Sequence, residues 1–177
     1  MILLPGVCAF ILFLLFDVNK IRWHRTFVNV SFPAGVILLA LSAALCIGRS
    51  TAGGVSLRFG VVICLILSAF SLFLTVYALF FALPAKTYSG AGSLSVVSSG
   101  LYGLCRHPAC WPFTLIYVFL YLAFGGKWLL GATILYPALN LIYVAIQDRY
   151  IFPKYIRGYD EYRASVPFLI PRLRKKP

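Results

Sequence analysis

The stretch from Ser98 to Pro112, SSGLYGLCRHPACWP, is the polar segment around which the rest of the chain is organised. Arg106 and His107 come directly before Pro108 and a new apolar run that begins at Trp111. We therefore expect both side chains to lie where a membrane helix meets water. Cations at such a boundary either anchor the helix by reaching the lipid headgroups or bind a ligand, and the anchor is the simpler interpretation.

The composition predicts the structural class. Of 177 residues, 62% are hydrophobic and only 11% are charged, whereas soluble domains average about half apolar and about a quarter charged residues. The chain is therefore expected to be an all-α, multi-pass integral membrane protein. Five apolar segments are predicted to cross the bilayer, namely Leu3–Phe16, Phe32–Ile47, Phe59–Leu83, Trp111–Phe124 and Trp128–Ile146.

The remaining segments predict how the chain is divided. Residues 1–84 are expected to form a three-helix membrane scaffold, and residues 85–177 a binding loop, a helical hairpin and a tail, all within one integrated domain. After Asp148 the tail is amphipathic, which favours a helix lying in the membrane interface. Three prolines are expected to break this helix, namely Pro153, Pro167 and Pro171. Three tyrosines are expected to share one face of it, namely Tyr155, Tyr159 and Tyr162.

The distribution of positive charge predicts the orientation. With the N-terminus outside, thirteen of the sixteen Lys and Arg residues fall in inside segments, as the positive-inside rule prefers. The tail and the site would then be cytoplasmic, and the tail would attract anionic membrane lipids. Cations divided among short loops disfavour nucleic-acid binding. The oligomeric state stays open.

Several smaller patterns carry weaker predictions. The polar residues Tyr136, Asn140, Tyr143 and Gln147 recur on one helical face, which should point toward protein rather than lipid. Ser68, Ser71 and Thr75 form a small-residue stripe that would admit a neighbouring helix. Asp17 and Asn19 are expected to be interfacial caps. No disulfide and no metal site are expected, since Cys105, His107 and Cys110 make a poor zinc site, and Gly90–Gly92 is interpreted as a flexible loop.

Two motifs together resemble a known family. SSGLYGLCRHP and QDRYIFPKYIRGYDEYRASVPFLIP, in that order and separated by an apolar hairpin, are similar to the integral-membrane methyltransferases typified by isoprenylcysteine carboxyl methyltransferase and phosphatidylethanolamine N-methyltransferase. The similarity spans roughly Ser98 to Pro171. It implies a site for S-adenosylmethionine, with Arg106, His107 and Asp148 as catalytic residues and further cofactor contacts from Pro108, Gln147, Tyr159 and Tyr162.

The chemistry of these residues suits that cofactor. S-adenosylmethionine carries a sulfonium, an ammonium and a carboxylate, so Arg106 and Asp148 are expected to bind it from opposite sides. A carboxylate acceptor needs no general base, whereas a phospholipid amine must lose a proton to His107 or Asp148. The acceptor is expected to be a lipophilic small molecule or a lipidated substrate, bound near Tyr136, Asn140 and Tyr143.

Two other functions remain open at this stage. An NADPH-dependent lipid or sterol reductase would share the RHP motif and the C-terminal arrangement. A non-catalytic membrane scaffold of the same fold is favoured by three departures from the family pattern: Cys110, Pro112 and Gln147, the last of which leaves Asp148 as the single acid of a pair.

Overall fold

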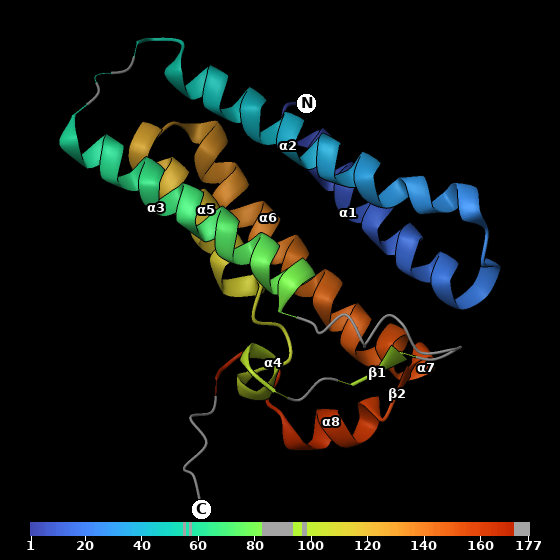
Figure 1. Cartoon of the computed structure of the whole chain (residues 1–177). Coiled ribbons are helices and arrows are strands. Elements are labelled where there is room, and N and C mark those ends of the chain that lie inside the picture. The colour runs from blue at the N-terminus through green and yellow to red at the C-terminus, as the bar shows by residue number, and fades with distance from the viewer. Residues whose placement is uncertain (55, 57, 83–93, 97–98, 172–177) are drawn as a thin grey trace, which may run out of the picture.

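Long apolar helices dominate the structure (Figure 1). A computed structural model describes residues 1–54, 56, 58–82, 94–96 and 99–171. Within these residues, four helices are long and apolar enough to cross a membrane. They are α1 (Leu4–Val18) with η1 (Asn19–Trp23); η2 (Thr26–Val30) with α2 (Ser31–Thr51); α3 (Phe59–Val76) with η3 (Tyr77–Phe81); and α6 (Lys127–Ile146) with η5 (Gln147–Ile151) and α7 (Phe152–Tyr155).

The helices pack as two pairs joined by α6. α1 lies along α2, and α3 lies along α5 (Cys110–Phe124), while α6 contacts α1, α2 and α5. Helices from both sides of residue 84 therefore pack together. At 15 residues, α5 is shorter than the four long helices. The core cluster comprises Ala9, Phe10, Phe13, Cys46, Tyr117, Leu129, Ala132 and Tyr136.

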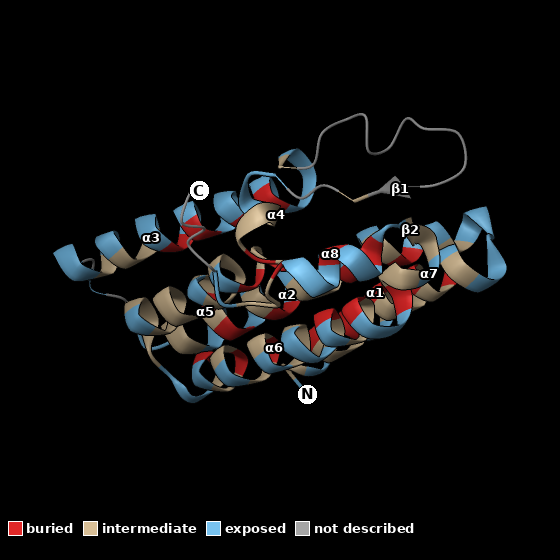
Figure 2. Ribbon diagram, turned by 90° about the horizontal axis from the view of Figure 1, so that it is seen from below, coloured by how far each residue is buried: buried red, intermediate tan, exposed pale blue. Residues whose placement is uncertain are grey.

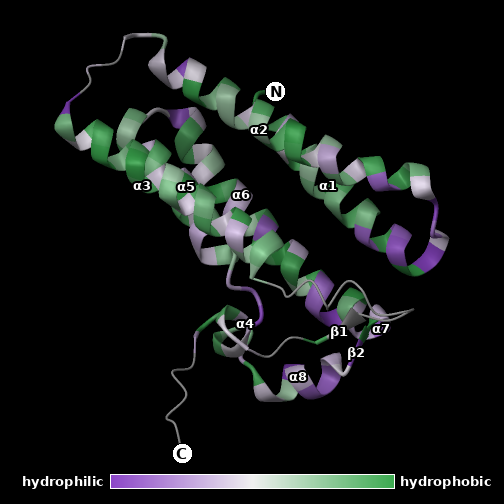
Figure 3. Ribbon diagram, viewed as in Figure 1, coloured by the Kyte–Doolittle hydropathy of each residue, from purple (hydrophilic) through white to green (hydrophobic). Residues whose placement is uncertain are grey.

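The outer faces of the helices are apolar. Figure 2 shows buried residues on inward faces and exposed residues outside, and Figure 3 shows that the long helices consist mostly of hydrophobic residues. Phe73 on α3 and Ile134 on α6 are 61% and 66% exposed. Exposed apolar side chains on long helices are typical of a protein surrounded by lipid. The helical membrane class predicted from composition is thus supported.

Small and polar residues bring the helices close together. Ser68, Ser71 and Thr75 are all buried on α3, as predicted, and Ser68 Oγ donates to the carbonyl of Ile116 on α5 at 3.2 Å. Small side chains allow such close approach where lipid supplies no hydrophobic driving force between helices.

Tyr136 connects α6 to both N-terminal helices. Its side chain is fully buried, and its hydroxyl bonds Ser42 on α2 and donates to the carbonyl of Leu3 at 3.3 Å. Its ring fills the space beside Gly6, where a Cβ atom would overlap it. The first helix can therefore approach α6 only because residue 6 has no side chain.

The tail helix is broken as predicted, and α8 ends just before Pro167, but the first break does not lie at Pro153. Pro153 lies in the first turn of α7, where the missing N–H is tolerated. The helix ends instead at β2 (Ile156–Arg157) and Gly158, whose φ of 76° lies in the left-handed region that favours glycine. Tyr155 is therefore not on the same helix as Tyr159, which begins α8 (Tyr159–Ser165).

A short parallel strand pair lies beside the helices of this otherwise helical fold. β1 (Leu94–Ser95) pairs with β2, with Leu94 opposite Ile156. It joins the segment before α4 (Leu101–Leu104) to the point where the tail helix breaks. The predicted Gly90–Gly92 loop and Leu83, the predicted end of the third span, lie outside the described residues.

Candidate functional site

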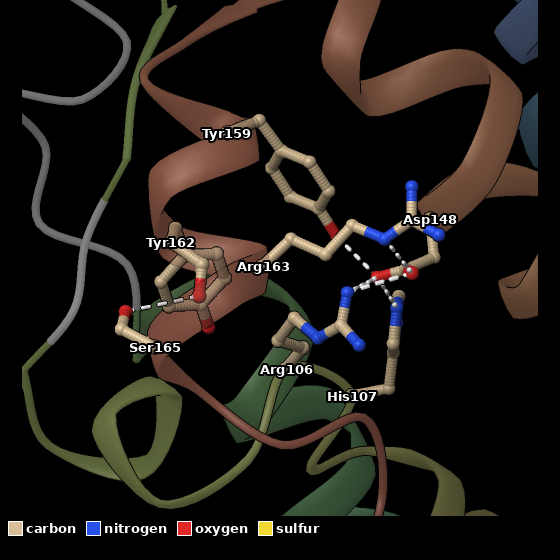
Figure 4. A network of polar contacts seen from close by, with 7 residues as sticks. All are labelled: Arg106, His107, Asp148, Tyr159, Tyr162, Arg163 and Ser165. Carbon is tan, nitrogen blue, oxygen red and sulfur yellow. Dashed lines mark hydrogen bonds and ion pairs between the residues drawn. The ribbon is translucent and has the colours of Figure 1, made fainter.

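Asp148 lies at the centre of a polar cluster (Figure 4). Asp148 is only 5% exposed. Arg106 Nη1 lies 2.7 Å from each carboxylate oxygen, and the Tyr159 hydroxyl donates to Oδ1 at 2.6 Å. His107 Nε2 is 3.3 Å from Oδ1, and Arg163 Nε is 3.6 Å from Oδ2. Side chains from the segment before α5, from η5 and from α8 therefore meet at one carboxylate.

Backbone contacts with the tail hold Arg106 and His107 in place. The segment after α4 is extended at Cys105. The Arg106 N–H donates to the carbonyl of Pro167 at 2.9 Å, and the His107 N–H to that of Phe168 at 3.3 Å. Because these partners are some sixty residues apart in the chain, only folding creates the cluster.

Two phenylalanines enclose the imidazole of His107. Phe152 stacks on it, with ring centroids 6.0 Å apart, and Phe168 packs edge-on at 5.1 Å. The guanidinium of Arg106 also lies 5.5 Å from the Phe168 centroid. Sequence reasoning missed both rings, because apolar residues in an apolar chain carry no distinguishing signal. Phe168 therefore contacts the side chains of both Arg106 and His107.

Tyr159 is a neutral donor in this cluster. Burial raises the pKa of its phenol, and the neighbouring Asp148 carboxylate raises it further. Tyr162, also predicted to contact the cofactor, donates to the carbonyl of Tyr102 at 2.7 Å. It supports the turn that carries Arg106 but forms no bond to Asp148. Pro108 is half-buried in the turn before α5.

One buried donor of Arg106 has no partner among the described residues. Its side chain is 9% exposed and its Nη1 binds Asp148, but its buried Nε has no hydrogen-bond acceptor within the described part of the chain. Leaving a buried charged donor unpaired is costly. Two guanidinium groups surround one carboxylate, so the cluster carries an excess positive charge that an added anion would neutralise.

Gln147 binds a second carboxylate. Its Nε2 donates to Oδ2 of Asp17 at 2.7 Å, and Tyr143 donates to the same oxygen at 2.6 Å. Asp17 is only 3% exposed, so the predicted interfacial cap is a buried acceptor between α1 and η5. Gln147, predicted to contact the cofactor, thus pairs with Asp17. The signal for Asp17 in the sequence was its rarity, since the chain has only four acidic residues.

The residues predicted to bind substrate lie farther away. Tyr136 precedes Asp148 by twelve residues, or about 18 Å of helix, and is part of the core. Asn140 Nδ2 lies 3.5 Å from Cys110 Sγ. Together with Tyr143, they face protein as predicted, yet none of the three bonds to a member of the Asp148 cluster.

Within the described ranges, no group of three His, Cys, Asp or Glu side chains is arranged to hold a metal ion, and the five cysteines are free thiols.

Comparisons with protein-family models, with curated proteins and with solved structures give no match for this chain.

Proposed function

We propose that the protein transfers a methyl group from S-adenosylmethionine to a lipophilic acceptor at the membrane interface. The unpaired Nε of Arg106 carries this proposal, because a buried cationic donor beside an ion pair suits a carboxylate ligand. The resemblance to the membrane methyltransferases names the same arginine, together with His107, Asp148 and Tyr159, and these four are in contact.

The residues of the Asp148 cluster fit the cofactor, but in a different arrangement from the one expected. Arg106 and Asp148 contact each other directly rather than facing from opposite sides of a space. Arg106 would hold the cofactor's carboxylate through Nε, with Arg163, 39% exposed in its side chain, adding positive charge from the open side. The bound cofactor supplies an electrophilic methyl group. Asp148 fixes the Arg106 side chain in place for that contact.

His107 supplies the one base that an amine acceptor would need. Its Nε2 faces Asp148, and the flanking rings of Phe152 and Phe168 restrict its rotation. An imidazole oriented in this way by a carboxylate can take a proton from a phospholipid-type amine. An isoprenylcysteine-type carboxylate acceptor would use alignment alone.

We also propose that α5 is a fifth membrane span and that the site faces the cytoplasm. At 15 residues α5 is about 22 Å long, short of a hydrocarbon core of about 30 Å, but Trp111 and Lys127 flank it as interfacial anchors. In this arrangement the site, the α1–α2 turn and the tail share the side that carries thirteen cations. A cysteine introduced at Lys175 that reacts with an impermeant reagent on intact cells would show the opposite orientation.

The deciding experiment is calorimetry on the purified full-length protein. S-adenosylmethionine should bind the wild type and lose about ten- to a hundredfold in affinity in Arg106→Ala, as expected for a lost hydrogen bond to a charged group. Arg157→Ala, which removes an exposed arginine of β2, is the matched control and should bind normally. No binding to the folded wild type would refute the proposal.

Transfer to lipid is measured separately. Radiolabelled S-adenosylmethionine is offered with acceptors that share one reactive group but differ in tail length. Burial of a tail contributes about 0.8 kcal/mol per methylene, so transfer should increase with tail length. Equal transfer to tail-less analogues would exclude a lipophilic acceptor.

A non-catalytic membrane scaffold is the second candidate, and one observation favours it. Both oxygens of Asp148 already have partners in Arg106, His107, Tyr159 and Arg163. An ion-pair network whose carboxylate already has its partners can have a purely structural role, which is to join the tail to the helices. Stable protein that binds neither S-adenosylmethionine nor its demethylated product would support this function.

A further inference from the structure

The turn between α1 and α2 is strongly basic. Residues 19–30, here called the basic turn, contain Lys20, Arg22 and Arg25, and no acidic residue occurs between Asp17 and Asp148 in the whole sequence. Figure 3 shows hydrophilic residues, interspersed with hydrophobic ones, in this turn at the end of two hydrophobic helices. Trp23 and Phe27 beside the cations are 45% and 70% exposed. Aromatic and basic residues mixed in this way are typical of the membrane–water interface.

Asn19 makes the basic turn rigid. It is 1% exposed, and its Nδ2 donates to the carbonyl of Arg25 at 2.9 Å and to Oδ1 of Asn29 at 3.1 Å. The Arg25 N–H donates back to Asn19 Oδ1 at 3.0 Å. His24 completes the turn in the left-handed region with φ of 54°, and its N–H donates to the Asn19 carbonyl at 2.8 Å. The turn is therefore preorganised.

A cavity of about 410 Å³ opens against this frame, lined by Phe16, Asn19, Lys20, His24 and Asn29. The Lys20 ammonium lies 4.3 Å from the centroid of the Phe16 ring, and no carboxylate of the described residues forms an ion pair with it. Asn29 accepts from Asn19 through Oδ1, which leaves its Nδ2 without an acceptor in the described part of the chain. The cavity thus offers a cation and a free amide donor.

We propose that this cavity binds the phosphate of an anionic phospholipid. The phosphate would take the Lys20 ammonium and the Asn29 amide, while Trp23 and Phe27 lie among the headgroups and upper acyl chains. A lipid is favoured over a soluble phosphate because the same turn carries the exposed aromatic residues Trp23 and Phe27, and it joins two helices that are long and apolar enough to cross a bilayer. The site shares no residue with the Asp148 cluster, so it stands independently of the methyltransferase proposal.

The test measures lipid binding by the full-length protein in neutral detergent. Native mass spectrometry with phosphatidylglycerol, phosphatidylcholine and inorganic phosphate gives the affinity for each. Phosphatidylglycerol should bind more tightly than phosphatidylcholine, and Lys20→Ala should weaken it about fivefold. Asn29→Asp keeps the acceptor for Asn19 but places a negative charge in the cavity, so it should weaken binding at least about tenfold. Lys20→Arg keeps the cation and should preserve binding.

Lys127→Ala is the matched control. Lys127 is also exposed and lies over an aromatic ring, 5.6 Å from that of Trp128, but it begins α6 at the other membrane surface. Its loss should leave phosphatidylglycerol affinity unchanged. The proposal would be overturned by equal affinity for both lipids, by an equal loss in Lys127→Ala, or by full affinity retained in Asn29→Asp. Complete displacement of the lipid by inorganic phosphate would assign the cavity to a soluble anion instead.

Discussion

Gln147 and Asp148 are neighbours in the chain, yet each belongs to a different buried cluster. Gln147 Nε2 lies 2.7 Å from Oδ2 of Asp17 on the first helix, while Asp148 Oδ2 lies 2.7 Å from Nη1 of Arg106. Both residues are in η5, a π-helical turn, and such turns are frequent at functional sites. One turn of helix therefore ties α1 and the segment before α5 to the same point.

The Arg106–Asp148 pair should be essential for stability. Both side chains are less than 10% exposed, so Asp148→Ala leaves buried guanidinium charge uncompensated and should lower the free energy of unfolding by about 3–5 kcal/mol. Thermal or denaturant unfolding in detergent measures this loss. The double variant with Arg106→Ala should lose less than the sum of the single changes. Additive losses would contradict direct coupling, and Asp160→Ala, an exposed acid of α8, should change little.

The Asp17–Gln147 contact should stabilise the packing of α1 on α6. Asp17→Ala removes the acceptor of Gln147 and Tyr143 and should cost about 1.5–3 kcal/mol in the free energy of unfolding. Exchange of the two groups, Asp17→Asn with Gln147→Glu, should recover part of that loss, because an amide and a carboxylate again face each other. No recovery in the exchanged variant would indicate that Asp17 acts through other partners.

The raised pKa of Tyr159 should make the folded protein less stable at alkaline pH. Because the folded pKa of its phenol lies above the ordinary value of 10.0, its contribution is complete below pH 10 and is lost as the pH rises toward the folded pKa. Unfolding followed from pH 7 to pH 11 should thus show a steeper alkaline loss for the wild type than for Tyr159→Phe. Below pH 10, Tyr159→Phe should be less stable, because it lacks the hydrogen bond to Asp148. Tyr150→Phe, at an exposed tyrosine, should match the wild type.

Gly6 should tolerate no side chain. A Cβ atom there would overlap the Tyr136 ring, whereas one at Gly48 on α2 meets nothing within 4 Å. Gly6→Ala should destabilise the protein by about 1–3 kcal/mol, and Gly48→Ala should be neutral or stabilise it by up to about 1 kcal/mol. Thermal unfolding of the two variants compares them directly. An equal effect at both positions would contradict the close packing of α1 on α6.

Local patterns in the sequence predicted the helices well, but the partners of buried charges poorly. Hydropathy and spacing located the long helices and the protein-facing residues from Tyr136 to Gln147, since both depend on nearby residues alone. They could not show that Gln147 pairs with Asp17, because that contact joins residues 130 positions apart across a helix crossing.

The sequence by itself determined that this is a helical membrane protein with its scarce charged residues gathered near helix ends, because too few polar groups exist to cover a water-soluble fold. Tertiary structure decided which charges meet. It paired Arg106 directly with Asp148, placed the first break of the tail helix before Gly158 rather than at Pro153, and left Arg106 Nε without a partner among the described residues. A buried charge takes its partners from whatever segments the packing brings within about 3 Å, and the crossing of helices, not their composition, sets that distance.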